Sequence, residues 1–238
     1  GDWSSDVCSS DLNDAALASI KALGATHIWY TGVLHHASMT DYSNFGIAPD
    51  DPDVVKGRAG SPYAIRDYYN VSPDLAVYPG ERLAEYEALI QRTHWHGLKV
   101  IMDIIPNHVA RGYRGDSTPP GVNVYGEGDD RSVAYRYTND FYYLPDTEFV
   151  VPTTEKQLPG MDGHFNEVPA RWTGNDVKSP SPSVNDWFET VKINYGIDPE
   201  GNRLFPEIPD ELKQASPEAS VAYWSEQIDR KSTRLNSS

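Results

Sequence analysis

The chain has 238 residues, of which 39% are apolar and 11% aromatic, including 15 tyrosines. This composition is typical of a globular protein and not of a disordered one. The formal net charge of −15 argues against a nucleic-acid partner, because binding phosphates requires clustered Lys and Arg. No stretch approaches the roughly 18 apolar residues of a membrane span, so we expect a soluble protein without a membrane partner, either cytoplasmic or exported.

Both ends of the chain lack the pattern of the residues between them. Segments 1–12 (GDWSSDVCSSDL) and 230–238 (RKSTRLNSS) are rich in serine and resemble translated sequencing-adapter scars. We expect both to be non-native and the native N-terminus to be missing, with ordinary terminal tails as the alternative. The only cysteine, Cys8, lies in the first of these segments. The interior therefore has no disulfide and no thiolate metal site.

The first native residues predict a helix followed by a strand. Asn13 or Asp14 can cap the helix, apolar residues recur at helical spacing, and Gly24 ends it. The segment 26–32 (THIWYTG) then predicts a short buried strand.

A polar stretch from about residue 34 to residue 77 follows, rich in Gly, Pro and Asp and without a sustained period. It predicts a long loop, and a loop of this length in a compact domain is usually functional. His35 and His36 lie in it and could line a pocket, but a solvated pair is the simpler expectation.

The clearest helix is predicted for residues 79–97, with Pro79 in its first turn and Gly97 at its end. The following segment 98–105 (LKVIMDII) is a continuous apolar run, which is typical of a strand in a parallel sheet covered on both faces. The order helix, strand, loop, helix, strand indicates an α/β fold.

The pattern changes at residue 109. Segment 109–198 is rich in Gly, Pro, Asp, Tyr and Trp and contains short β-like pieces such as FYYLP and TVKINYG. We expect an irregular, β-rich insertion there. Segment 199–229 has helical spacing from about residue 209 and predicts a return to the α/β pattern.

Three polar residues follow the apolar run in KVIMDIIPNH: Asp103, Asn107 and His108. In a (β/α)8 barrel, functional residues lie at the carboxyl ends of strands, and this cluster occupies such a place. Two alternatives remain open. Asp and Asn could cap the loop while His packs beside them, or the cluster could be a metallohydrolase site, although no second ligand stands at suitable spacing beside His108.

The segment GLKVIMDIIPNH closely resembles the first signature of the α-amylase family, glycoside hydrolase family 13, in which a strand ends in Asp-x-x-x-Asn-His. Upstream, SPYAIRDYYNVSPDL resembles that family's Gly-Tyr-x-x-x-Asp-Tyr-x-x-Val-x-Pro stretch, and ALGATHIWYTGV resembles its preceding strand. The order and spacing of these three segments agree with those of the family, and the resemblance extends from about residue 13 to residue 229.

The resemblance implies a partial (β/α)8 TIM barrel. Residues 13–108 would supply its first helix, its second and third strands and the helix between them. Residues 109–198 would form the inserted domain B after the third strand, and residues 199–229 would return to the barrel.

The resemblance also implies roles for three residues in binding the substrate. Tyr63 would stack on a sugar, because the apolar face of a pyranose packs on an aromatic ring; the alternative is a core tyrosine. His108 would hydrogen-bond a hydroxyl of the same sugar. Asp103 would orient neighbouring groups at the mouth of the barrel.

A calcium ion is a further implication, with Asn107 as a ligand through its side-chain oxygen. However, TVKINYG stands where the family has Leu-Pro-Asp-Leu-Asn, so that Lys192 replaces an aspartate of the calcium shell. A lysine can neutralise nearby carboxylates as a cation would. We therefore keep three alternatives: bound calcium, the Lys192 ammonium in its place, or a solvated Lys192.

The insertion contains aromatic residues that could form sugar platforms. The alternative is that they make the small core of the insertion. These residues are Trp172, Trp187, Tyr142 and Tyr143.

The function implied is that of a retaining hydrolase of the amylase type acting on oligo- or polysaccharide α-glucans. Such hydrolysis needs two carboxylates about 5–5.5 Å apart, and the family's nucleophile context, Gly-Phe-Arg-x-Asp, does not occur here. We expect a truncated fragment that lacks nucleophile and acid/base, is inactive alone and, with unpaired strand edges, expresses poorly. The alternatives are a glucosyl-transferring or isomerising relative of the trehalose synthase or sucrose-cleaving type, and a non-catalytic carbohydrate-binding member.

Overall fold

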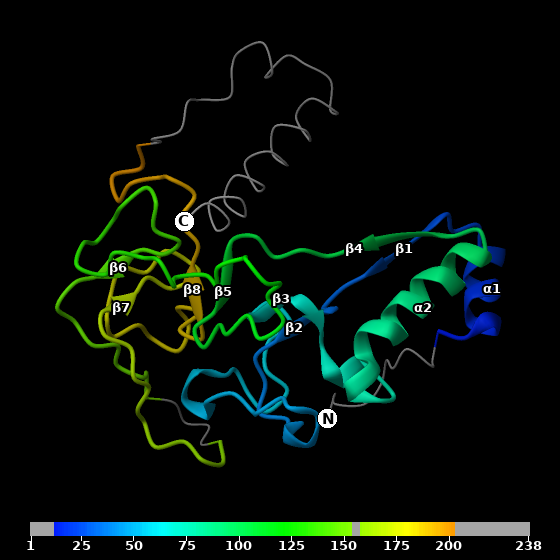
Figure 1. Ribbon diagram of the computed structural model, residues 1–238, viewed down its shortest axis with the longest axis horizontal. Helices are drawn as coiled ribbons and strands as arrows, with labels where there is room; N and C mark the ends of the chain where they lie inside the picture. The colour runs from blue at the N-terminus through cyan, green and yellow to red at the C-terminus, as the bar shows by residue number, and fades with distance from the viewer. Residues whose placement is uncertain (1–11, 154–157, 203–238) are drawn as a thin grey trace, which may run out of the picture.

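A computed structural model describes residues 12–153 and 158–202 (Figure 1). The predicted helix within 199–229 and the terminal segments, apart from Leu12, lie outside the described residues. The helices are α1 (Asp14–Ala22) and α2 (Arg82–Trp95), and the strands are β1 (His27–Tyr30), β2 (Leu34–His36), β3 (Ile65–Val71), β4 (Lys99–Met102), β5 (His108–Ala110), β6 (Tyr143–Leu144), β7 (Ala170–Arg171) and β8 (Thr190–Lys192).

Strands β1 and β4 form a parallel pair, as the α/β pattern predicts. Their register runs from His27 opposite Lys99 to Tyr30 opposite Met102. Both strands therefore end at the same edge, where the backbone N–H of Asp103 donates to the carbonyl of Tyr30 at 3.1 Å. The 103–108 loop begins at this edge.

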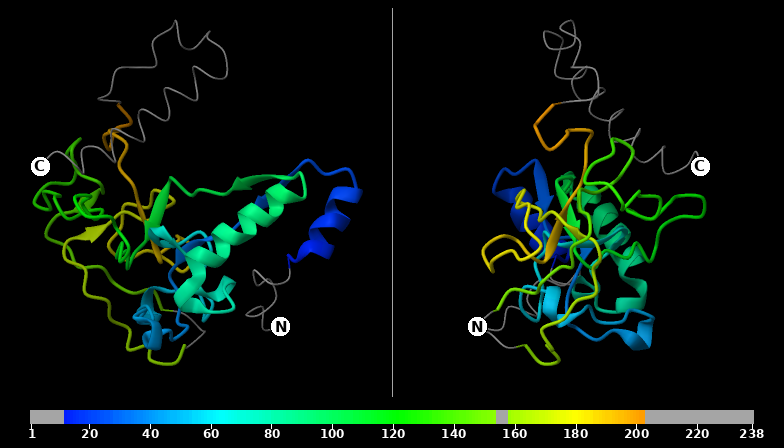
Figure 2. Two further views of the ribbon diagram at one scale, coloured as in Figure 1. Left: turned by 45° about the vertical axis from the view of Figure 1, so that its right-hand side comes forward. Right: turned by 90° about the vertical axis from the view of Figure 1, so that its left-hand side faces the viewer.

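The two helices begin and end close to where their capping residues predict. The side chain of Asn13 accepts a hydrogen bond from the backbone N–H of Ala16 at 3.1 Å, which caps α1. The helices lie side by side (Figure 2). Lys21 of α1 donates to the carbonyl of Gly97, just beyond α2, and His96 lies 2.9 Å from Asp14.

The β1–β4 pair is covered on one face only, which corrects the prediction of two buried strands. Helix α2 packs beside the pair (Figure 1). On the pair and just beyond it, Trp29 is 62% exposed, Ile101 47% and Ile104 61%. The apolar run that suggested complete burial is thus only half buried among the described residues.

The stretch predicted as a long loop contains the longest strand of the described chain. Strand β3 pairs antiparallel with β2, and both His35 and His36 are buried, so the expectation of a solvated pair is wrong. Arg66 on β3 is also buried and donates to the carboxylate of Asp50 at 3.1 Å. Buried polar residues on β3 remove the hydrophobic alternation by which a strand is recognised.

The segment predicted as an insertion contributes to two short antiparallel pairs, β5 with β8 and β6 with β7. One hydrophobic cluster in it consists of Val109, Phe141, Tyr143, Val191 and Ile193. FYYLP and TVKINYG contain β6 and β8, as predicted.

The strands of the described residues form four separate two-stranded sheets, and these do not close into a barrel. The partial barrel and the division into barrel and insertion therefore stay predictions. None of the helices in the described ranges combines the length and the apolar character needed to cross a bilayer.

Candidate functional site

Asp103 immediately follows β4 at the carboxyl edge of the parallel pair and is half-buried. Within residues 12–153 and 158–202 its carboxylate has no hydrogen bond or ion pair. It stands at the place that the sequence predicts, but no such contact joins it to the other predicted residues. Its orienting role stays a prediction.

Two tyrosine hydroxyls hold the loop from Asp103 to His108. The hydroxyl of Tyr68 donates to the carbonyls of Ile105 and His108, the second at 3.3 Å. The hydroxyl of Tyr195 donates to the carbonyl of Pro106 at 2.5 Å. Burial raises the pKa of the Tyr68 hydroxyl far above its usual value, so it remains a proton donor. Sequence reasoning missed both residues, although Tyr68 belongs to the Asp-Tyr pair of a recognised motif.

Asn107 is fixed by three polar contacts. The ammonium of Lys192 on β8 donates to its Oδ1 at 2.6 Å. Because an ammonium can only donate, the Asn107 amide must present its oxygen to Lys192. The Nδ2 group then donates to the carbonyl of Gly174 at 2.8 Å and to Nδ1 of His108 at 3.0 Å. The neutral His108 ring therefore carries its proton on Nε2.

The contacts of Lys192 bear on the expected calcium site. Its ammonium also lies 3.2 Å from the Asp176 carboxylate, so a positive charge already stands between Asn107 and an acidic partner. A calcium ion would need the oxygen that Lys192 occupies, together with several further oxygen ligands. The described residues at this point do not fit a calcium ion.

His108 on β5 is buried, with 6% of its surface exposed. Burial lowers the pKa of its ring; a hydrogen bond with the backbone of Tyr63 raises it, and the charge of Lys192 lowers it further. The ring is therefore neutral at neutral pH. Asn107 occupies Nδ1 of the ring, so Nε2 is the nitrogen that a ligand hydroxyl could reach.

Two aromatic residues flank His108 and remain exposed. Tyr63, whose backbone affects the pKa of the His108 ring, is 53% exposed, so the core-tyrosine alternative is wrong. Trp187 lies on the segment before β8, with its ring centroid 5.3 Å from that of His108, and is 42% exposed. The structure therefore gathers Tyr63, His108 and Trp187 in one place.

The other aromatic residues considered as platforms are core residues. Tyr142, Tyr143 and Trp172 are each less than one tenth exposed. Trp172 stacks on Tyr142 with ring centroids 4.5 Å apart. The platform interpretation is therefore excluded for these three residues and remains open for Trp187.

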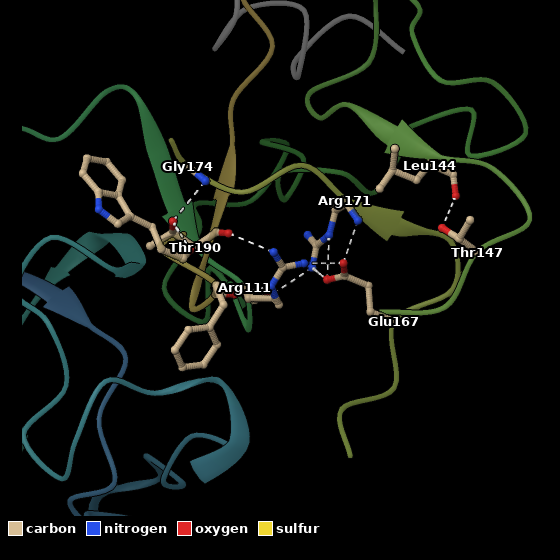
Figure 3. A network of polar contacts seen from close by, with 9 residues as sticks. Arg111, Leu144, Thr147, Glu167, Arg171, Gly174 and Thr190 are labelled. Atoms are coloured by element: carbon tan, nitrogen blue, oxygen red, sulfur yellow. Dashed lines mark hydrogen bonds and ion pairs between the residues drawn. The ribbon is translucent and has the colours of Figure 1, made fainter. Parts of the chain in front are cut away.

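Gly174 allows the segment after β7 to lie against His108. A Cβ atom at this position would be 2.9 Å from Cγ of His108 and 2.4 Å from Oγ1 of Thr190. The Gly174 N–H instead donates to that hydroxyl at 3.1 Å (Figure 3). Any side chain here would displace His108 or Thr190.

Arg111, Glu167 and Arg171 form a buried ionic cluster (Figure 3), and Arg111 links it to the β5–β8 pair by donating to the carbonyl of Thr190 on β8. Arg111 is 1% exposed and pairs with Glu167 at 2.5 Å, while Arg171 pairs with the same carboxylate at 2.6 Å. Burial lowers the pKa of Arg111 to about 10, against the opposing effect of Glu167. Burial alone would raise the pKa of Glu167, but the charges of Arg171 and Arg111 outweigh it and hold that pKa below its usual range.

A sequence model of the alpha-amylase catalytic domain matches residues 15–179. This range includes Tyr63, Asp103, Asn107 and His108 and ends before Trp187 and Lys192. No curated protein matches the chain.

Several solved structures are similar to parts of this chain. An alpha-amylase from Lactobacillus plantarum is 26% identical over 52% of this chain and 25% of its own, with a TM-score of 0.35. A maltogenic alpha-amylase from Thermotoga neapolitana is 25% identical over 42% of this chain and 19% of its own (TM-score 0.32). A trehalose-6-phosphate hydrolase from Bacillus licheniformis is 26% identical over 42% of this chain and 14% of its own (TM-score 0.28). The matched part thus spans a quarter or less of each of these proteins.

Proposed function

Because this chain belongs to the alpha-amylase family of glycoside hydrolases, we propose that it supplies part of the sugar-binding site of a retaining, α-glucan-active enzyme. The observation that carries the proposal is the exposed ring of Tyr63, whose backbone lies close enough to the buried, neutral ring of His108 to affect its pKa. An exposed aromatic ring packs on the apolar face of a pyranose, and the neighbouring imidazole offers a polar partner to its hydroxyls.

In this proposal Nε2 of His108 donates to the sugar hydroxyl, while Nδ1 keeps its bond with Asn107. Asp103, at the end of β4, orients the groups at the rim of the site, and its half-buried carboxylate is available for that role. The neutral state of His108 suits the proposal, because an uncharged sugar gains nothing from a charged ring that is costly to bury.

The same proposal gives Lys192 the role that calcium would play in ordering Asn107. The ammonium supplies the positive charge, bonds the Asn107 oxygen and pairs with Asp176. We expect the order of the 103–108 loop to be independent of calcium.

We further propose that this chain binds α-glucans without hydrolysing them. Retaining hydrolysis requires a nucleophile and an acid/base carboxylate about 5–5.5 Å apart. The 238 residues contain no Gly-Phe-Arg-x-Asp segment to supply the nucleophile.

A titration of the full 238-residue chain with maltohexaose, followed by isothermal calorimetry and by release of reducing sugar, tests the proposal. We expect binding without hydrolysis. Tyr63→Ala should weaken binding about tenfold, roughly 1.4 kcal/mol, while Tyr78→Ala should not, since Tyr78 is an exposed tyrosine (68%) that serves as a matched control. Folded protein that binds no α-glucan, or equal affinities for both variants, would contradict the proposal.

A further inference from the structure

Trp187 has an unusual backbone conformation, lies against His108 and is nevertheless partly exposed. Its backbone has φ of +47°, a region in which a bulky side chain is an outlier. Its ring lies against His108 at 5.3 Å, and the residue is still 42% exposed. An exposed tryptophan held in an unfavourable conformation calls for a reason other than packing.

The segment from Trp187 to Thr190 is held in place by hydrogen bonds to its backbone carbonyls. The N–H and the hydroxyl of Thr190 both donate to the Trp187 carbonyl, at 2.9 and 2.8 Å. The buried Arg111 donates to the carbonyls of Phe188 and Thr190, at 2.5 and 3.1 Å. Thr190 and Arg111 thereby hold the backbone of residues 187–190 in place.

The orientation of the Trp187 ring leaves it available to a ligand. Its plane is tilted by 56° from that of His108, so the two rings are not stacked face to face and the indole is not covered by the imidazole. Tyr63, the other exposed aromatic residue of the site, has its backbone close enough to the same His108 ring to affect its pKa. His108 is thus a common neighbour of two exposed aromatic residues from segments far apart in the sequence.

From this arrangement we propose that Trp187 is a second sugar-contacting residue, which packs on a glucosyl unit beside the one that Tyr63 binds. The proposal rests on the proposed function and extends it: the site recognises at least two linked glucosyl units, so maltotriose binds more tightly than glucose. Trp187 lies outside the range that the family model matches, and this contact would be a feature of the insertion in this chain.

Three variants of the full chain test the proposal. Trp187→Asn removes the ring with a residue that tolerates positive φ, whereas Trp187→Phe keeps an aromatic face. Trp95→Asn removes an exposed tryptophan at the end of α2 (81% exposed) and serves as the control. Affinity for maltotriose and for glucose is measured by calorimetry, and folding by the melting temperature.

We expect Trp187→Asn to weaken maltotriose binding about tenfold, to leave glucose binding within about twofold, and to keep the melting temperature close to that of the parent chain. Trp187→Phe should restore most of the affinity, and Trp95→Asn should change nothing. If instead Trp187 only shields His108, Trp187→Asn lowers the melting temperature and leaves affinity unchanged, which overturns the proposal.

Tryptophan fluorescence provides a measurement that does not depend on the Asn variant being folded. Maltotriose should change the emission of the parent chain, and this change should be absent in Trp187→Phe. A change that persists in Trp187→Phe overturns the role of Trp187 while the proposed function stands. A parent chain that binds neither sugar overturns both.

Discussion

The Lys192 ammonium donates to Oδ1 of Asn107 at 2.6 Å, across a register in which Lys192 stands opposite His108. The side-chain oxygen of Asn107, which the sequence suggests as a calcium ligand, therefore accepts a hydrogen bond from a lysine of the same chain. Because Lys192 also pairs with Asp176, the lysine connects three segments of the chain.

The first prediction concerns this lysine. Lys192→Met leaves the Asn107 oxygen without its donor and should lower the free energy of unfolding by about 1–3 kcal/mol. A chelator should leave the melting temperature of the parent chain unchanged. The free energy is measured by urea unfolding, with Lys99→Met, the same change at an exposed position of β4, as the control. A parent chain whose melting temperature falls on chelation would disprove the replacement of calcium by Lys192.

The second prediction concerns the hydroxyl of Tyr68, which holds the carbonyls of Ile105 and His108. Tyr68→Phe removes only this hydroxyl and should destabilise the chain by about 1–3 kcal/mol, because buried carbonyls lose a donor. Affinity for maltohexaose should also fall, because His108 is less well held. Tyr78→Phe, at an exposed tyrosine, should change neither quantity. Parent-like stability and affinity in Tyr68→Phe would rule out the positioning role.

The third prediction concerns the buried ionic cluster. Arg111→Met leaves Glu167 with a single cationic partner and removes the donor to the Phe188 and Thr190 carbonyls. Breaking a buried pair in this way typically costs about 3–5 kcal/mol. Chemical unfolding measures the loss. Arg136→Met, which removes an exposed pair with Asp130, should cost less than about 1 kcal/mol, and equal losses in the two variants would argue against the cluster as a structural centre.

The fourth prediction concerns His35 on β2. Burial, followed by the charge of Arg66, lowers the pKa of His35 to about 3. The unfolded chain binds this proton below about pH 6.5, whereas the folded chain stays neutral until about pH 3. The unfolded state therefore binds more protons between these values, and stability falls as the pH falls through this window.

Urea unfolding at about pH 7 and about pH 4 measures this loss. His35→Gln removes the titrating group and should reduce the loss by about 3 kcal/mol. His94→Gln, at an exposed histidine of α2, should retain it in full. The same pH dependence in all three proteins would show that His35 is not responsible.

The helices and the parallel strands could be predicted because their signals are local. Asn13 caps α1 as its position predicts, and the apolar runs give β1 and β4. Strand β3 could not be predicted, because its buried residues include Arg66 and Asp67. Their side chains bond Asp50, Asp116 and the backbone N–H of Ser117, which lie 16 to 50 positions away in the sequence, and no local pattern contains those partners.

In the candidate site, too, some residues could be predicted from local sequence signals and others could not. Tyr63, Asn107 and His108 stand in motifs that can be read along the chain, and the departure at Lys192 indicated its position near Asn107. The contact between His108 and Trp187 joins residues 79 positions apart, and the hydroxyl of Tyr68 reaches a loop 37 positions away. Such contacts depend on how segments meet, which neither composition nor periodicity specifies.

Because the β1–β4 pair is covered on one face only, copies of the chain can associate through its exposed face. Protein concentration therefore affects every measurement proposed above. Apolar side chains such as Trp29 and Ile104 stand more than half exposed along this pair and just beyond it, and a patch of this kind promotes association between copies. If two chains meet through it, light scattering should rise with protein concentration. A dilution series separates self-association from ligand binding. A dye that binds exposed apolar surface measures how much of this face is free at each concentration.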